Sequence, residues 1–177
     1  DQAIYSVSRG LLNIKLLELA DEFPNITLYF NTNCVKANLE DGIVYFKDEN
    51  GAKSLFKADR VIGSDGAFSA IRYEMQTKGR FDYSQTYLEH GYKELCIPPA
   101  ANGEFQLDKN CLHIWPRESF MLIALPNLDG TFTCTLFLQL EGALSFDSIK
   151  TSADLDAFFD TYFTDAKPLI ADLHHDF

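Results

Sequence analysis

Ala58-Asp-Arg-Val-Ile-Gly-Ser-Asp-Gly-Ala-Phe-Ser-Ala-Ile-Arg72 is the stretch from which the fold of this chain can be worked out. The apolar run Val61-Ile62 predicts a short strand that ends at Gly63, and Asp65-Gly66 predicts a tight turn into a helix over residues 67–75. Because a helix start offers free N–H groups and a positive dipole end, this arrangement suits a phosphate group. An ordinary strand–turn–helix without a ligand stays open as an alternative, since such turns are common.

The pattern Asp-Gly-x-x-Ser-x-x-Arg at residues 65–72 resembles the second nucleotide-binding motif of the flavin-dependent aromatic hydroxylases. Other blocks, spread in order over most of residues 4–170, are similar to the kynurenine hydroxylases of that family. They are Tyr5–Asn13, Arg80–Gln85, His90–Leu95, Leu112–Arg117, Ile123–Asn127 and Phe132–Phe137. Several blocks in order are far more specific than the single motif, although the resemblance covers only the middle of such an enzyme.

Two motifs that this family carries are missing. No Gly-x-Gly-x-x-Gly follows a predicted strand, where the family binds the FAD pyrophosphate, and the later Gly-Asp motif is absent too. The chain begins at Asp1-Gln2 and stops at His174-His-Asp-Phe177, and neither end has the look of a natural terminus. We therefore expect a piece of a larger flavoenzyme that has no turnover alone and binds FAD weakly or not at all.

Composition excludes some classes of partner. The 177 residues include 15 Lys and Arg against 26 Asp and Glu, and the net charge of −11 disfavours nucleic acid and anionic membranes. No apolar run approaches the roughly 20 residues of a spanning helix, so no membrane contact is expected within this segment. The four cysteines contain no Cys-x-x-Cys pair, which indicates reduced thiols and a cytoplasmic protein. A membrane anchor elsewhere in the parent protein stays open.

The histidines predict no metal site. His113 is expected to be a packed, hydrogen-bonded histidine, because it lies in the middle of a predicted strand beside Trp115. His174 and His175 are adjacent, so both cannot face one site on a regular element, and a surface position is expected.

Hydrophobic periodicity divides the chain into two parts. In the first part we expect a strand at 4–8, a helix at 10–22, a buried strand at 26–30, a hairpin of 34–39 and 43–47, and a strand near 54–57. In the second part we expect strands at about 86–97, 111–115, 120–125 and 132–140, followed by a helix from residue 152. Asn127-Leu-Asp-Gly130 predicts the hairpin turn between the last two strands. The expected helix caps are Ser8, Ser69 and Thr151-Ser152.

This order predicts an α/β fold of the mixed α+β kind. Residues 1–78 would form a partial FAD/NAD(P)-binding three-layer domain that contains the Asp-Gly motif. Residues 79–177 would form an incomplete substrate domain built on an antiparallel sheet. The resemblance implies the arrangement of flavoproteins similar to p-hydroxybenzoate hydroxylase.

Five residues are candidates for cofactor binding. Arg9 begins a helix, where its guanidinium could pair with a pyrophosphate or lie against a flavin ring; a solvated arginine is the alternative. The resemblance implies that Arg9 faces the FAD, with Asn13 one turn further on. Asp65, in the turn with Gly66, would reach a ribose hydroxyl or a bridging water. Arg72 either pairs with Asp65 or assists the nicotinamide cofactor, since its spacing serves both.

Alternation along two predicted strands defines a candidate substrate wall. One face of the first strand holds Met121, Ile123 and Leu125, and one face of the next holds Thr133, Thr135 and Phe137. The resemblance implies that this face lies over the aromatic ring of the substrate, where an apolar wall excludes water. An ordinary hydrophobic sheet face predicts the same residue types.

The resemblance implies a monooxygenase that hydroxylates L-kynurenine to 3-hydroxykynurenine with FAD, NADPH and O2 through a flavin C4a-hydroperoxide. No side chain of this chain need act as acid or base, because the flavin supplies the reactive chemistry. Another FAD-dependent hydroxylase or a halogenase of the same fold is one alternative, and a non-enzymatic β-sheet binding module is another. A fragment would expose the apolar faces where its missing parts docked, and would therefore be prone to self-association.

Overall fold

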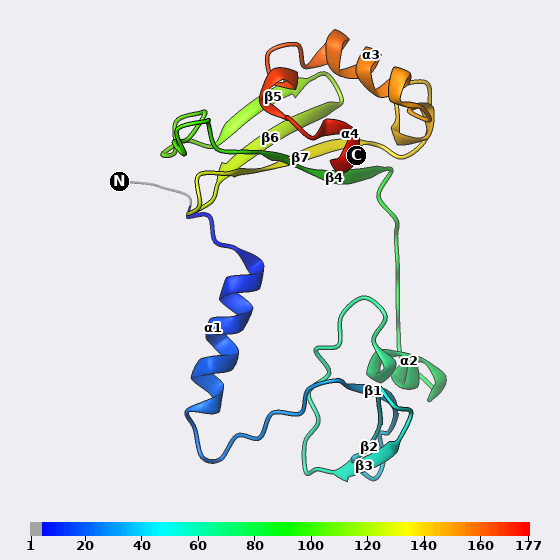
Figure 1. Cartoon of the computed structure of the whole chain (residues 1–177). Helices are drawn as coiled ribbons and strands as arrows, with labels where there is room; N and C mark the ends of the chain where they lie inside the picture. The colour runs from blue at the N-terminus through cyan, green and yellow to red at the C-terminus, as the bar shows by residue number, and fades with distance from the viewer. Residues whose placement is uncertain (1–4) are drawn as a thin grey trace. The chain divides into compact units, whose positions relative to one another are not determined.

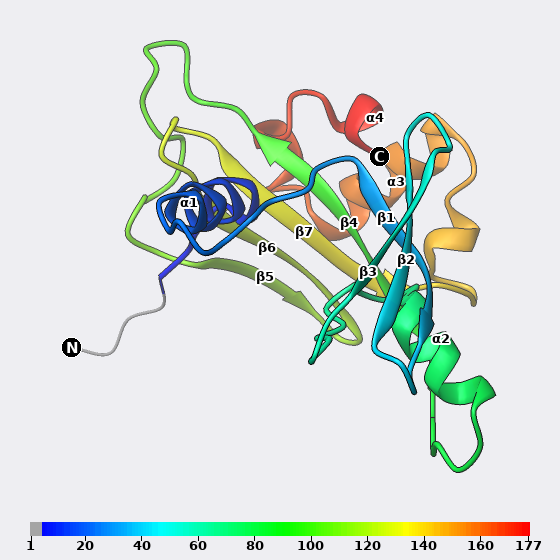
Figure 2. The ribbon, with the colours of Figure 1, turned by 90° about the horizontal axis from the view of Figure 1, so that it is seen from below.

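The computed structural model describes residues 5–177, which form two compact units. Unit 1 contains residues 5–15 and Tyr87–Phe177, and unit 2 contains Leu16–Thr86. Figure 1 and Figure 2 show the helices and strands of both units. The chain passes from unit 1 to unit 2 after residue 15 and returns to unit 1 after residue 86. The return lies eight residues beyond the predicted domain boundary at 78. The predicted roles of the two domains stay predictions.

Unit 1 is built on a four-stranded antiparallel sheet. Its strands are β4 (His90–Ile97), β5 (His113–Arg117), β6 (Phe120–Pro126) and β7 (Phe132–Gln139), in the order β4-β7-β6-β5. The hairpin between β6 and β7 closes where the Asn127 N–H donates to the Thr131 carbonyl over 2.8 Å. Gly130 adopts a φ of 88° there, a conformation that a side chain would strain. The four predicted strands are confirmed.

One face of this sheet is covered by short helices, which lie together on one side of it in Figure 1. These are α3 (Ser152–Tyr162), the 3₁₀ turns η1 (Phe146–Ser148) and η2 (Lys167–Leu169), and α4 (Leu173–Asp176). The core between the layers has fully buried side chains from strands and helices alike: Ile97, Leu122, Phe132, Cys134, Leu136, Leu138, Phe159 and Phe163. Burial raises the pKa of the Cys134 thiol to about 12, so this cysteine stays protonated at neutral pH.

Polar contacts tie the helical layer to both edges of the sheet. On the β5 edge, the Trp115 indole donates to the Asp165 carboxylate over 2.9 Å, and the Arg117 Nε donates to the Tyr162 carbonyl over 2.6 Å. On the β4 edge, the Cys96 N–H donates to the Asp176 carboxylate over 2.9 Å. Hydrogen bonds therefore attach the helical layer to both edge strands of the sheet, β4 and β5.

Unit 2 holds a three-stranded antiparallel sheet of β1 (Thr32–Asn38), β2 (Ile43–Asp48) and β3 (Lys53–Lys57), together with α2 (Ala70–Thr77). The predicted hairpin and its third strand are confirmed. At the turn between β2 and β3, the Asp48 carboxylate accepts the N–H groups of Asn50 and Ala52. This is the local hydrogen bonding for which aspartate is favoured in turns.

Three predicted strands do not form. Residues 5–8, 26–30 and 61–62 are irregular; the start of the first prediction, residue 4, lies outside the described residues. Tyr29 and Ile62 are 62% and 90% exposed, so these apolar runs are not core strands within residues 5–177. A strand needs a neighbour for its backbone N–H and C=O groups, and no described segment pairs with these three.

Helix α1 (Arg9–Asp21) confirms the helix predicted at residues 10–22. It begins as expected at Ser8, whose side chain accepts the Leu11 N–H over 3.3 Å. Although α1 is rich in leucine, none of its residues is buried. Within residues 5–177, no helix has both the length and the apolar character needed to cross a membrane.

Candidate functional site

The uncovered side of the unit 1 sheet, which we call the open face, is the candidate site. Burial alternates along β6 and β7, so the residues between the core positions point to the other side of the sheet. The open face consists of Tyr92, Glu94 and Cys96 from β4, Ile114 and Pro116 from β5, Met121, Ile123 and Leu125 from β6, and Thr133, Thr135 and Phe137 from β7. All six residues of the predicted wall therefore share one face, while their contact with substrate stays a prediction.

Strand pairing arranges these residues in rows across the sheet. The first row is Tyr92, Phe137, Met121 and Pro116; the second is Glu94, Thr135, Ile123 and Ile114. The Tyr92 and Phe137 ring centroids lie 6.2 Å apart. Thr135 lies between Glu94 and Ile123 in its row, and Glu94 is the single charged member of the open face.

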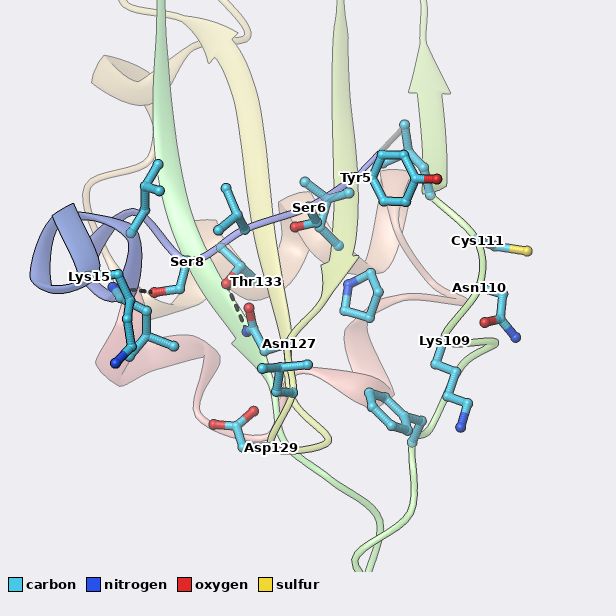
Figure 3. A pocket seen from close by; sticks show the side chains of 18 residues that line it. Tyr5, Ser6, Ser8, Lys15, Lys109, Asn110, Cys111, Asn127, Asp129 and Thr133 are labelled. Carbon is cyan, nitrogen blue, oxygen red and sulfur yellow. Dashed lines mark hydrogen bonds between the residues drawn. The ribbon is translucent and has the colours of Figure 1, made fainter. Parts of the chain in front are cut away.

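A pocket of about 1460 Å³ lies at one end of the open face, within unit 1 (Figure 3). Its lining comes from the start of the chain, from residues 105–112 and from the β6–β7 hairpin. Leu125 and Thr133 belong to both the pocket and the open face. The Asn127 amide donates to the hydroxyls of Thr131 and Thr133 over 2.9 and 3.0 Å, which adds a polar rim to an apolar wall.

The pocket includes none of the five predicted cofactor residues. Ser8, Leu12 and Lys15 of the first segment line it, whereas Arg9 and Asn13 of the same segment do not. Arg9 and Asn13 are exposed helix residues in unit 1, and Asp65 belongs to unit 2. A groove shared by Arg9 and Asp65 therefore stays a prediction.

The Asp-Gly turn in unit 2 is held by its own side chains. The Asp65 carboxylate accepts the Ser69 hydroxyl over 2.5 Å and the N–H groups of Ala70 and Ile71 over 2.8 and 3.3 Å. The Ser69 hydroxyl in turn accepts the Arg72 N–H over 3.0 Å, which confirms Ser69 as the helix cap. The hydrogen bond from Ser69 is the largest of several causes that lower the pKa of Asp65, and the backbone N–H groups lower it further.

Arg72 holds the same turn by a route that the sequence did not indicate. Its guanidinium donates to the Gly66 carbonyl over 3.1 Å and also to the Ala67 carbonyl, and it lies 5.5 Å from the centre of the Tyr83 ring. Of the two roles expected for Arg72, the pairing with Asp65 is therefore not found, because backbone carbonyls take the guanidinium N–H groups instead. A contact between Arg72 and a nicotinamide cofactor stays a prediction.

Two glycines shape this turn in different ways. Gly66 has a φ of 76°, and a Cβ built on it would meet no atom within 4 Å. A Cβ on Gly63 would lie 3.0 Å from the Ile71 side chain, so Gly63 lets α2 pack closely. A shallow groove of about 500 Å³, lined by residues that include Cys34, Phe46 and Asp65, borders the turn within unit 2.

Acid is expected to loosen the start of α2. Because the pKa of Asp65 is lowered from its ordinary 3.8, its hydrogen bonds stabilise the folded turn above that value and are lost as the pH falls through the lowered one. NMR protection factors of the Ala70 and Ile71 amides should therefore drop below about pH 4. Asp65→Asn should show low protection at neutral pH as well. Equal protection of the native amides at pH 3 and pH 6 would contradict this role of the carboxylate.

The histidines occupy the predicted kinds of position. His113 Nε2 lies 2.8 Å from the Asp108 carbonyl, and its ring packs edge-on against Phe132, as expected for a packed histidine. The side chains of His174 and His175 are 50% and 91% exposed. Within residues 5–177, no group of three or more His, Cys, Asp or Glu side chains is placed to hold a metal ion.

Sequence reasoning missed Tyr92, Glu94 and Ile114 on the open face and Asn127 at its rim. The alternation of His90–Ile97, in which Leu95 and Ile97 are the core positions, was a signal that could have assigned Tyr92 and Glu94 to the opposite face. Asn127 lay inside a predicted turn, and only the hairpin geometry turns its amide toward Thr133.

The fold defines a mixed α/β protein with two antiparallel sheets, one of which keeps a largely apolar face uncovered. Comparison with curated proteins shows which enzymes share its sequence. Kynurenine 3-monooxygenase of Dictyostelium discoideum is 51% identical over 98% of this chain, and those of Anopheles gambiae and Sus scrofa are 50% and 43% identical over 96%. The resemblance to kynurenine 3-monooxygenase is thus confirmed. This chain spans only 37%, 35% and 35% of the lengths of these three relatives, and no protein-family model matches it.

Proposed function

We propose that this chain forms part of an FAD-dependent monooxygenase that uses NADPH and O2 to hydroxylate L-kynurenine to 3-hydroxykynurenine. The observation that supports this most is the 43–51% identity to enzymes named kynurenine 3-monooxygenase over nearly the whole chain. Identity of this extent is spread over both units, so it is not confined to one short motif.

In this proposal the open face forms one wall of the substrate site. Met121, Ile123 and Phe137 supply apolar contact for an aromatic ring, and Leu125 and Thr135 border it. Such a wall orients the ring and excludes water from the reacting atoms. When bound, FAD supplies the redox chemistry that no side chain of this chain can perform.

The Asp-Gly turn of unit 2 is proposed, separately, as an element that binds the cofactor. Open space at Gly66 gives a nucleotide access to the backbone, and the Asp65 carboxylate keeps lone pairs beyond those used by Ser69, Ala70 and Ile71. These residues fit a ribose hydroxyl of FAD. Arg72 would then act by keeping the turn in shape.

We propose further that Arg9 and Asn13 contact FAD, that residues 1–78 belong to a three-layer FAD-binding domain, and that the protein is cytoplasmic.

A chimera tests this function. In it, the present chain replaces the matching 174-residue segment of the Dictyostelium discoideum relative. The chimera should oxidise NADPH in a manner that depends on L-kynurenine and should release 3-hydroxykynurenine, detected by mass spectrometry. A folded chimera that binds FAD but hydroxylates only simple phenols would favour another aromatic hydroxylase. A folded chimera without any hydroxylation would favour a non-enzymatic β-sheet module.

A further inference from the structure

Glu94 is a carboxylate without a partner at the edge of a largely apolar surface within the described residues. It is exposed, and the burial of Leu95 and Ile97 on the other side of β4 places it on the open face. Its side chain makes no hydrogen bond or ion pair with any residue in 5–177. Its charge acts on the open face nonetheless, as one of several causes that raise the pKa of the neighbouring Cys96 thiol, burial being the largest.

Strand register brings this carboxylate to the proposed substrate wall. Glu94 pairs with Thr135, and Thr135 pairs with Ile123 on the next strand. Neighbouring strands lie about 4.8 Å apart, so a glutamate side chain can extend over Thr135, on the side of Ile123. A ring that lies against Ile123 and Phe137 would therefore have one hydrogen-bond acceptor of full negative charge beside it.

We propose that Glu94 determines substrate specificity by accepting a hydrogen bond from an amino group on the aromatic ring of the substrate. This inference rests on the proposed function, because it needs an aromatic ring on the open face. The site would then favour 2-aminophenyl ketones over phenyl ketones without the amine. An acceptor-only carboxylate suits an aromatic amine, which donates hydrogen bonds well and accepts them poorly.

A second explanation of Glu94 leads to a different expectation. β4 is an edge strand of the sheet, and charges on edge strands discourage pairing with another chain. In that case Glu94 would affect self-association but would not distinguish between two rings. A comparison of matched rings therefore separates the two explanations.

The experiment measures ring binding to the complete chain by NMR titration. The probes are 2-aminoacetophenone and acetophenone, which differ only in the ring amine, and the signals followed are those of Ile123 and Thr135. The native chain should bind the amine roughly threefold to tenfold more tightly, as expected for one partly exposed hydrogen bond to a charged group. Glu94→Met, which keeps the length of the side chain but removes the acceptor, should bring this ratio close to one.

Glu141→Gln is the matched control, since it removes one negative charge from an exposed residue beyond the end of β7. It should leave the ratio unchanged. If Glu94→Met also leaves the ratio unchanged while both rings bind, the inference about Glu94 is overturned and the proposed function stands. If neither probe shifts the signals of the open face, the proposed wall is contradicted, and the role of Glu94 is overturned with it. Light scattering of Glu94→Met identifies an effect on association separately.

Discussion

Ile123→Arg in the chimera is expected to lower kcat/KM for L-kynurenine about 100-fold or more, which corresponds to about 2.7 kcal/mol of transition-state stabilisation. Ile123 occupies the centre of the open face, where it pairs with Thr135 on one side and Ile114 on the other. A guanidinium there covers the wall and can pair with the Glu94 carboxylate in the same row, so a ring loses both its apolar contact and its hydrogen-bond acceptor. The measurement is steady-state NADPH oxidation and product formation over a range of L-kynurenine concentrations.

A measurement of stability separates the loss of kcat/KM in Ile123→Arg from misfolding. Because Ile123 lies on the uncovered side of the sheet, its replacement should leave the unfolding midpoint of unit 1 nearly unchanged. Ala157→Arg is the control, since it introduces the same side chain at an exposed residue of α3 on the other side of the sheet. Equal losses of kcat/KM in the two variants would show that the open face has no special part in the reaction.

Phe159→Ala should destabilise unit 1 by about 3–5 kcal/mol, the usual cost of a cavity left by a buried phenylalanine. Phe159 is fully buried, and its ring lies 5.5 Å from the rings of both Phe158 and Phe163. A domain is typically stable by about 5–15 kcal/mol, so this single change removes a large part of the total. Urea unfolding followed by tryptophan fluorescence measures the loss.

The chain suits this measurement because it contains one tryptophan, Trp115, which is held in unit 1 by its hydrogen bond to Asp165. Phe68→Ala is the control, because Phe68 is fully exposed and lies in unit 2. It should change the free energy of unfolding of unit 1 by no more than about 0.5 kcal/mol. A loss below about 1 kcal/mol for Phe159→Ala would contradict the helical layer as the essential cover of the sheet.

The antiparallel parts of the fold were predictable because their signals are local. Alternation defines β6 and β7, the Asn127–Gly130 turn joins them, and Thr151 marks the start of α3. Each hairpin pairs residues close in sequence, so the strand that pairs with a given strand follows directly along the chain. The same reasoning gave the correct cap for α2 at Ser69.

The predicted strands at 26–30 and 61–62 were wrong for a related reason. Their apolar runs are typical of buried strands, but an apolar run does not indicate which segment of the chain pairs with it. Within residues 5–177 no partner strand is present for either run, and both remain irregular. For Arg72 the residue spacing allowed several partners, and the backbone of the turn at Gly66 and Ala67 was the one used.

The sequence by itself determined the four strands of the unit 1 sheet, the residues that share a face on β6 and β7, the cap of α2 and the relationship to kynurenine 3-monooxygenase. Periodicity, turn chemistry and residue identity depend on neighbours along the chain, so they can be recognised without coordinates. Only the tertiary structure decided which face α3 and α4 cover and which residues meet across strands. Glu94 and Ile123 are 29 positions apart, and they share a row only because long-range pairing sets the register of β4, β7 and β6.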